Sequence, residues 1–190
     1  MTKSILLVGV GGQGTILASK LLTLGLMEAG YDVKMSEIHG MSQRGGSVSS
    51  QVRYGEKVAS PVIEKGGADI LVSFEKMEAL RWLGHLKPDG KVVVNDFEIS
   101  PMPVLSGKMK YAKDILDEIK AKADTIVINA AEEAEKLGNA KVMNIILLGT
   151  IVKAMGLEDI AWNQLINDNV KPAFIEINQK ALAVGRDLIK

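Results

Sequence analysis

The sequence predicts a doubly wound α/β fold, in which one mostly parallel sheet carries helices on both faces. The chain begins with a continuous apolar run, Ser4–Gly9, which is typical of a strand buried on both faces. A glycine-rich stretch and a helical pattern follow this run directly. Further apolar runs at 68–74, 91–96 and 124–129 each alternate with a helical pattern. This alternation predicts a single α/β domain over residues 1–190.

In the first third of the chain, a helix is expected over 15–30, where Gly30 is a C-terminal stop. Residues 31–38 predict a second strand, which would complete a right-handed βαβ unit. Residues 47–55 alternate with polar residues, which predicts a half-exposed or edge strand. The apolar residues at helical spacing on the first helix are Ile16, Leu17, Leu21, Leu24 and Met27.

Five helical patterns and one irregular segment are expected in the remainder. A short helix follows the strand at 68–74, and 88–90 form a turn before the next strand. Residues 100–108 predict an irregular connection, and 111–123 an amphipathic helix. A polar helix should end at Gly138. Residues 141–156 are apolar on nearly all sides, which indicates a buried helix whose Gly149 lets another backbone approach closely. A last helix from about Pro172 aligns five residues on one face. They are Phe174, Ile177, Ala181, Val184 and Leu188.

Composition excludes several functions. The 23 basic and 23 acidic residues balance, which gives no support for nucleic-acid binding. The chain has no cysteine, so it carries no disulfide, thiolate nucleophile or cysteine-ligated iron–sulfur cluster. With two histidines, no metal site is expected. The longest later apolar run, between Lys141 and Lys153, has 11 residues, whereas a bilayer span needs about 20. We therefore expect no membrane association and a cytoplasmic protein.

The first motif has the glycine spacing of a dinucleotide-binding loop. Gly9, Gly11 and Gly14 satisfy G-x-G-x-x-G after a strand and at the start of a helix, as in a Rossmann-like fold. Gly9 would permit the tight turn, and Gly11 and Gly12 would let a phosphate approach the backbone. The helix N-terminus would attract that anion. The alternative is that the glycines only shape a close β–α turn.

The second motif lies where such a fold reads out a ribose. Glu37 could bind the ribose hydroxyls, but His39 and an arginine-glycine-glycine loop follow it at once. This loop offers guanidinium donors, hydroxyl groups and freedom to adopt positive φ, which suit an anion or a partner's backbone. The alternative is a surface turn with one solvated arginine. The candidate binding residues of both loops are Gly9, Gly11, Gly12, Gln13, Gly14, Ser42, Gln43, Arg44, Gly45 and Gly46.

Taken together, the motifs resemble a known family. The stretches "GVGGQGTILASKLL", "SEIHGMSQRGGSVSSQVRYG" and "KLGNAKVMNIILLGTIV" are similar to the gamma-type subunit of the 2-oxoacid:ferredoxin oxidoreductases. The His-Gly-Met-Ser-Gln-Arg-Gly-Gly form most resembles the beta subunit of the indolepyruvate members. The resemblance implies an oxidoreductase subunit that is inactive alone and supports CoA-dependent oxidative decarboxylation of an aryl pyruvate.

The resemblance also implies how the chemistry is divided between chains. Thiamine diphosphate, magnesium and the iron–sulfur clusters would lie on a larger partner subunit, which passes electrons to ferredoxin. This chain has neither the cysteines nor a Gly-Asp-Gly thiamine motif, since its nearest match reads Pro88-Asp89-Gly90. CoA is expected at the glycine loops, and the isolated chain is expected to form a homodimer. The choice of 2-oxoacid would belong largely to the partner's pocket.

Two alternatives from other classes stay open at this point. One is a stand-alone NAD(P)- or FAD-binding oxidoreductase, and the other is a nucleotide-sensing module without turnover. No residue is a clear catalytic candidate. His39 is considered for acid–base work beside a partner's cofactor because imidazole titrates near neutral pH. A structural hydrogen-bonding role for His39 is the alternative, and His85 is expected to have no function.

Overall fold

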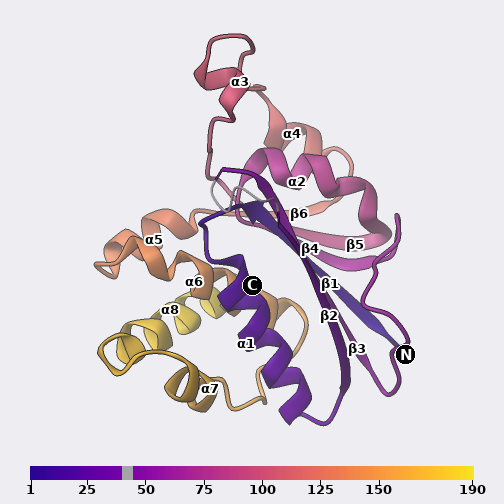
Figure 1. Cartoon of the computed structure of the whole chain (residues 1–190), viewed down its shortest axis with the longest axis vertical. Coiled ribbons are helices and arrows are strands. Elements are labelled where there is room, and N and C mark those ends of the chain that lie inside the picture. The colour runs from indigo at the N-terminus through magenta and orange to yellow at the C-terminus, as the bar shows by residue number, and fades with distance from the viewer. Residues whose placement is uncertain (40–44) are drawn as a thin grey trace.

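A computed structural model describes residues 1–39 and 45–190 and confirms the expected doubly wound α/β fold (Figure 1). A single six-stranded sheet has the order β2-β3-β1-β4-β5-β6. The strands are β1 (Lys3–Val10), β2 (Asp32–His39), β3 (Ser47–Gly55), β4 (Ala68–Ser73), β5 (Leu86–Asn95) and β6 (Asp124–Ile128).

The sheet is mostly parallel, with β3 as its antiparallel strand. β1, β4, β5 and β6 pair in parallel, whereas β3 pairs antiparallel with both β1 and β2. β2 therefore runs in the same direction as β1, but β3 lies between them. The prediction that 47–55 forms a half-exposed or edge strand is wrong. Ser49, Ser50 and Gln51 are 2%, 3% and 6% exposed. β2 takes the edge position, so β3 lies inside the sheet, where α1 packs on it.

Two helical layers cover the sheet (Figure 1). One face carries α2 and α4, and the other carries α1 and the C-terminal group of helices. The residues of the connection between β5 and α4 extend away from this body as an arm that includes α3. The helices are α1 (Thr15–Glu28), α2 (Lys76–Trp82), α3 (Met102–Leu105), α4 (Ile115–Lys120), α5 (Ala130–Lys136), α6 (Met143–Ala154), α7 (Trp162–Asn169) and α8 (Ile175–Asp187). Three 3-10 turns are η1 (Leu83–His85), η2 (Ala140–Val142) and η3 (Pro172–Phe174).

The buried face of α1 matches the predicted one only in part. Leu21 is fully buried, and Leu17 and Leu24 pack against the core. Ile16 and Met27 are 54% and 56% exposed, whereas Ala18, Leu22 and Leu26 are fully buried. The helix is apolar around most of its circumference, so spacing alone does not select a face. The sheet on one side and α6 and α7 on the other decide the orientation.

The buried helix predicted at 141–156 is confirmed as α6, and Gly149 has the expected role. A Cβ atom at Gly149 would lie 2.3 Å from the Leu182 carbonyl oxygen of α8. A Cβ atom at Gly185 would lie 1.9 Å from the Ile146 carbonyl oxygen. The backbones of α6 and α8 are therefore in direct contact, which only glycine permits at these two positions.

Three further boundaries differ from prediction. The turn at 88–90 lies inside β5, where the register with β4 shifts. The amphipathic helix expected over 111–123 is shortened to α4. The last helix starts as η3, and Phe174 is 46% exposed rather than on the buried face. None of the helices in residues 1–39 and 45–190 is long and apolar enough to cross a membrane.

Candidate functional site

The glycine loop between β1 and α1 is held by its own glutamine. The Gln13 side-chain oxygen accepts the Val10 N–H at 2.8 Å, and its Nε2 donates to the Phe74 carbonyl at 2.9 Å. A Cβ atom at Gly9 would lie 2.9 Å from the Phe74 Cβ, so this glycine serves close packing. Both polar groups of the Gln13 amide bond within the chain. The loop is thereby fixed against the end of β4.

The two glycine motifs lie against each other. The Gly11 N–H donates to the Gly46 carbonyl at 2.8 Å, and the Gly45 N–H donates to the Gly11 carbonyl at 3.3 Å. The Gly11 N–H is therefore engaged within the chain. Gly12 has φ +102°, and a Cβ atom there would meet no described atom within 4 Å. Relative to the described residues, Gly12 is thus a loop position with open space beside it. The predicted residues Ser42, Gln43 and Arg44 lie outside the described residues.

His39 and Glu37 take different positions at the end of β2. His39 is exposed and lines a cavity of about 310 Å³ together with glycine-loop residues. Glu37 accepts a hydrogen bond from the Ser19 hydroxyl of α1 at 2.6 Å, so one of its oxygens is bound to the helix. The structure therefore brings His39 beside the loop and ties Glu37 to α1.

Asn144 is a candidate site residue that sequence reasoning missed. It lies in the first turn of α6, is 6% exposed, and donates from Nδ2 to the Gly14 carbonyl at 3.2 Å. Gly14 has φ +82°, and a Cβ atom there would lie 2.6 Å from Asn144 Nδ2. A lone asparagine in an otherwise apolar helix was the available signal. This contact places the start of α6 beside the start of α1.

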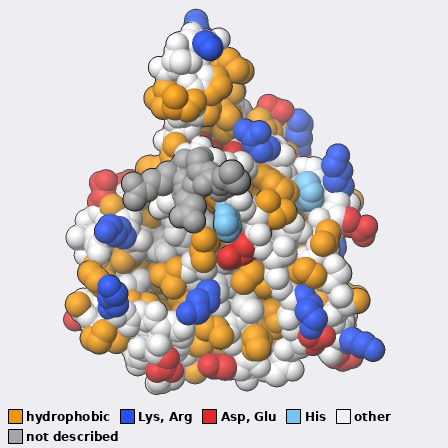
Figure 2. Space-filling model, in the orientation of Figure 1, with side chains coloured by type: hydrophobic (Ala, Val, Ile, Leu, Met, Phe, Trp, Pro, Cys, Tyr) orange, Lys and Arg blue, Asp and Glu red, His pale blue; other side chains and the backbone are white. Residues whose placement is uncertain are grey.

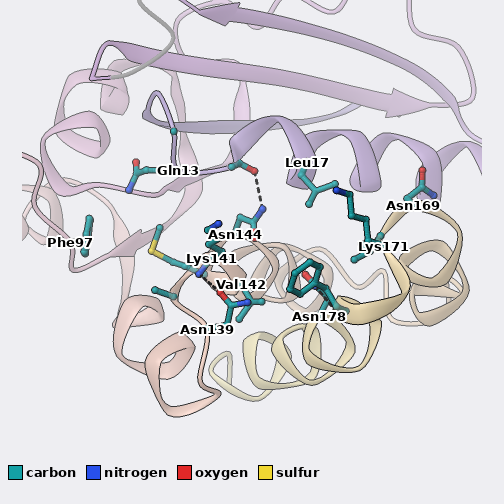
Figure 3. A pocket seen from close by; sticks show the side chains of 16 residues that line it. Gln13, Leu17, Phe97, Asn139, Lys141, Val142, Asn144, Asn169, Lys171 and Asn178 are labelled. Carbon is teal, nitrogen blue, oxygen red and sulfur yellow. Dashed lines mark hydrogen bonds between the residues drawn. The ribbon is translucent and has the colours of Figure 1, made fainter.

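A cavity of about 710 Å³ opens between these two helix starts and α8 (Figure 3). Lys141 and Lys171 line it, and no acidic side chain does so among the described residues. Neither lysine forms an ion pair with another described residue. No described side chain caps the α1 N-terminus, and the first turn of α1 contains no acidic residue. The other lining residues are Gly12, Gln13, Gly14, Leu17, Phe97, Asn139, Ala140, Val142, Met143, Asn144, Asn169, Val170, Phe174 and Asn178.

The physical properties of this cavity suit an anionic ligand with an apolar part. Unbonded N–H groups at a helix start carry partial positive charge, and the two ammonium groups add full charges. Leu17, Phe97 and Phe174 supply apolar surface. Its volume is within the usual range of small-molecule sites, about 300–1,000 Å³. No group of three or more His, Asp or Glu side chains suited to a metal ion occurs in the described part of the chain.

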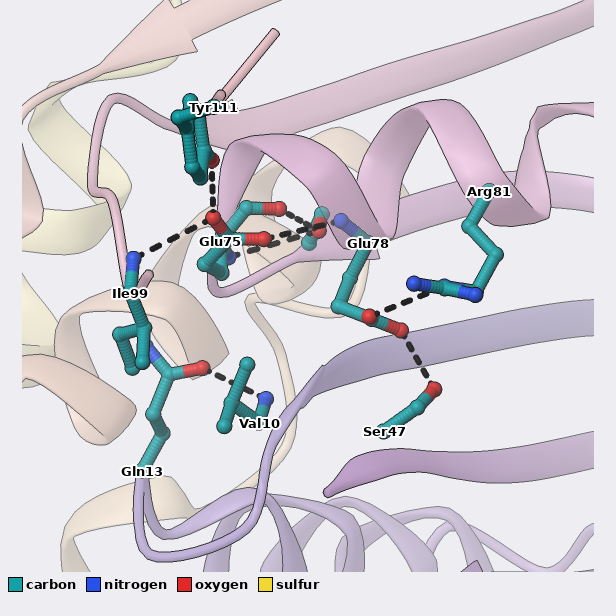
Figure 4. Close-up of polar contacts among 9 residues, drawn as sticks. Val10, Gln13, Ser47, Glu75, Glu78, Arg81, Ile99 and Tyr111 are labelled. Carbon is teal, nitrogen blue, oxygen red and sulfur yellow. Dashed lines mark hydrogen bonds and ion pairs between the residues drawn. The ribbon is translucent and has the colours of Figure 1, made fainter. Parts of the chain in front are cut away.

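Two buried glutamates at the start of α2 form hydrogen bonds to neighbouring segments of the chain (Figure 4). Glu75, 1% exposed, accepts hydrogen bonds from the Tyr111 hydroxyl and from the N–H groups of Glu78 and Ile99. Glu78, 4% exposed, accepts from the Ser47 hydroxyl and pairs with Arg81 at 3.1 Å. Burial and then the Glu75 carboxylate raise the pKa of Tyr111, so its hydroxyl stays protonated as the donor. Glu78 thus fixes the residue that follows the second glycine loop.

Comparison with curated proteins gives relatives over the full length of the chain. The indolepyruvate oxidoreductase subunit IorB of Archaeoglobus fulgidus is 37% identical, covering 97% of this chain and 94% of that protein. The 2-oxoglutarate synthase subunit KorC of Methanothermobacter marburgensis is 28% identical, covering 100% and 97%.

Solved structures share the fold. The gamma subunit of keto/oxoacid ferredoxin oxidoreductase from Geobacter sulfurreducens has a TM-score of 0.72 at 24% identity, over 98% of this chain and 97% of that one. The 2-oxoglutarate:ferredoxin oxidoreductase of Magnetococcus marinus was solved with 2-oxoglutarate, coenzyme A and succinyl-CoA bound. It has a TM-score of 0.75 at 18% identity, over 98% of this chain and 31% of its own longer chain.

The model of the family described as pyruvate ferredoxin/flavodoxin oxidoreductase matches residues 4–188. This match and the 37% identity over 97% of the chain confirm the resemblance seen in the motifs. The chain therefore belongs to the pyruvate ferredoxin/flavodoxin oxidoreductase family and is a subunit of a 2-oxoacid ferredoxin oxidoreductase.

Proposed function

We propose that this subunit binds the nucleotide part of coenzyme A in the cavity between α1, α6 and α8, for an enzyme that oxidises aryl pyruvates. The single observation that carries the proposal is the charge of that cavity. Two unpaired lysines and two helix starts line it, and none of its described lining residues is acidic.

The phosphates are assigned to the glycine-loop end of the cavity. There the exposed backbone of Gly12 lets an oxygen approach, and the first-turn N–H groups of α1 supply donors. Lys141 and Lys171 add cationic donors. Adenine is assigned to the apolar surface near Phe174, where side-chain amides of neighbouring asparagines can bond its edge. The Magnetococcus protein with coenzyme A bound supports this choice of ligand.

The redox chemistry is assigned to a larger partner subunit. This chain has no cysteine to hold an iron–sulfur cluster. Thiamine diphosphate would supply the decarboxylation chemistry on that partner, and ferredoxin would take the electrons there. The role of this chain is to bind and orient coenzyme A at the shared edge. His39 remains a prediction for acid–base work, and we expect the complex in the cytoplasm.

We choose an aryl pyruvate as substrate because this chain is more similar in sequence to the indolepyruvate relative than to the 2-oxoglutarate relative. The indolepyruvate relative is 37% identical, whereas the 2-oxoglutarate relative is 28% identical over a comparable length. We therefore propose indolepyruvate or a related aryl pyruvate as substrate.

The test measures equilibrium binding of coenzyme A to the assembled complex by calorimetry. Lys141→Gln and Lys171→Gln each remove one ammonium from the cavity, and Lys20→Gln on the exposed face of α1 is the matched control. Loss of one charged hydrogen bond, about 1.5–3 kcal/mol, predicts an affinity about 10- to 150-fold weaker in each cavity variant. The control should bind as the wild type does.

Two outcomes would contradict the proposal. Wild-type affinity in both cavity variants would show that the phosphates bind elsewhere. Binding of NAD or FAD more tightly than coenzyme A would favour the stand-alone nucleotide-binding alternative. Binding of dephospho-CoA, which lacks the 3′-phosphate, is measured in parallel. The variant whose lysine contacts the 3′-phosphate should bind dephospho-CoA as tightly as the wild type does.

A further inference from the structure

The connection between β5 and α4 extends from the body as an arm, defined here as residues 99–111 (Figure 1). Three of its apolar side chains are largely exposed. Met102, Leu105 and Met109 are 73%, 68% and 63% exposed, more than any other large hydrophobic residue in the described part of the chain except Met1. Figure 2 shows hydrophobic side chains gathered on this projection.

The arm is nevertheless built as an ordered element. At its tip, the N–H groups of Leu105 and Met109 donate to the Pro101 and Pro103 carbonyls, both at 3.0 Å. The main chain is thus folded on itself while its apolar side chains face solvent. Ordering a segment costs conformational entropy, and side chains that stay exposed do not offset this cost by burial within the chain.

Buried groups fix the base of the arm on both sides (Figure 4). One oxygen of Glu75 accepts from the Ile99 N–H at 3.3 Å on the outgoing side and from the Tyr111 hydroxyl on the returning side. The Lys76 N–H donates to the Phe97 carbonyl at 3.0 Å just before the arm. The arm therefore leaves the body in a direction set by the first turn of α2.

The arm carries positive charge only. From Ile99 to Tyr111 the sequence contains two lysines and no acidic residue. Lys108 and Lys110 on the arm are exposed and form no ion pair with a described residue. A surface that covers this arm should be apolar at its centre and acidic at its rim. Contact between the arms of two copies would bring like charges together, which disfavours a second copy of this chain as the partner that covers the arm.

The arm is continuous with the proposed coenzyme A cavity. Phe97 lines that cavity and lies two residues before the arm begins. A partner that closes the cavity from the edge of the sheet therefore meets the arm as well. We propose that the arm docks into an apolar, acid-rimmed groove of the larger subunit, an inference that rests on the proposed function of this chain as the coenzyme A-binding partner of that subunit.

The test uses the full chain and the larger subunit purified from the same organism and identified by mass spectrometry. The arm variant carries Met102→Ser, Leu105→Ser and Met109→Ser. The control carries Met27→Ser and Val62→Ser, which are 56% and 61% exposed but outside the arm. Three exposed anchors lost from an interface centre predict an affinity at least about 100-fold weaker for the arm variant. The control should stay within about twofold.

A charge variant and a protection measurement test the same surface independently. Lys108→Glu with Lys110→Glu should slow association at low salt about tenfold or more, whereas Lys20→Glu with Lys65→Glu should not. Amide hydrogen exchange of 102–109 should slow when the larger subunit binds. Melting curves of every variant should overlay that of the wild type, because none of the changed side chains is buried.

The outcomes separate this inference from the proposed function. If the wild-type chain binds no larger subunit, the proposed function fails as well. If the wild type binds and the arm variant binds equally, with amides of 102–109 unprotected, the arm inference alone is overturned. Loss of a homodimer with unchanged binding to the larger subunit would assign the arm to a second copy and also overturn it. Coenzyme A affinity, measured on the same complexes, reports the proposed function separately.

Discussion

Replacing Gly149 with alanine tests how the contact between α6 and α8 sets the shape of the cavity. The new Cβ atom would lie 2.3 Å from the Leu182 carbonyl oxygen, 2.9 Å from the Gly185 Cα and 3.0 Å from the Arg186 nitrogen. All three are backbone atoms of α8, so no side-chain rotation relieves the overlap. Ordinary carbon contacts lie at about 3.5 Å, so the two helices must separate by about 1 Å.

The expected destabilisation follows from two opposing effects. Overpacking a close-packed core costs about 1–3 kcal/mol, and the upper end applies because backbone atoms must move. Alanine in a helix interior is more favourable than glycine by about 1 kcal/mol, which offsets part of this cost. The net loss in the free energy of unfolding is therefore about 2 kcal/mol. For a chain of this length, that loss lowers the melting temperature by about 4–8 °C.

The same displacement should reach the cavity. Asn144 lies at the start of α6, whereas Phe174 and Asn178 belong to the start of α8, and all three line the cavity. A separation of about 1 Å changes the distance between its two walls, so coenzyme A affinity should fall along with stability.

Calorimetric melting and coenzyme A titration measure the two effects. Gly84→Ala is the matched control, because Gly84 lies in η1 and a Cβ atom there meets no described atom within 4 Å. The control should change stability by less than about 0.5 kcal/mol. Wild-type melting of Gly149→Ala would refute the close backbone contact. A lower melting temperature with unchanged coenzyme A affinity would refute the link between this contact and the cavity.

Three further predictions address the rest of the molecule. Burial opposes ionisation of Asp69, but bonds from Lys87 at 2.7 Å and the Ser4 N–H at 2.8 Å outweigh it and lower its pKa. Ionised Asp69 stabilises the folded state by about 1 kcal/mol after allowance for solvent screening. This contribution is fully present above the ordinary carboxyl pKa and is lost as the pH falls through the lowered pKa of Asp69. Urea titrations should therefore show a shallower acid dependence in Asp69→Asn, and equal dependence in both proteins would contradict this. Arg44→Ala should weaken coenzyme A binding or subunit association by about 10- to 150-fold with little change in melting temperature. A large fall in melting temperature alone would make Arg44 structural. The isolated chain should not turn over aryl pyruvate with coenzyme A, thiamine diphosphate, magnesium and a viologen dye, and turnover without a second subunit would refute the division of chemistry.

Several features followed from local sequence because their physical causes are local. The continuous apolar run of β1 predicts burial on both faces, and Ile5 to Val8 are fully buried. The glycine at the centre of α6 predicts a close backbone approach, which α8 makes. The glycine motif also lies where the sequence places it, between a strand and a helix. In these cases residue size and hydrophobic run length are enough to select one structure.

Other features depend on which elements become neighbours. β3 has the polar pattern of an edge strand, yet β2 takes the edge beside it, and Ser49 and Ser50 are buried. α7 had no predicted counterpart, and its Trp162 packs on Gly25 of α1, where a Cβ atom would lie 2.7 Å from the indole ring. Each outcome needs a partner that is distant in sequence, so periodicity within one segment does not contain it.

The candidate site divides in the same way. Sequence alone determined that this chain has the glycine spacing of a dinucleotide-binding loop, that it holds no cysteine-ligated cluster, and that it resembles an oxidoreductase subunit. Only the tertiary structure joins Gly14 to Asn144, 130 positions later, and opens a cavity between α1, α6 and α8. Likewise, only the tertiary structure shows that Met102, Leu105 and Met109 of the arm are exposed. The physical reason is that a motif needs only backbone geometry over a few residues, whereas a cavity or an exposed surface is what remains after every other segment has packed.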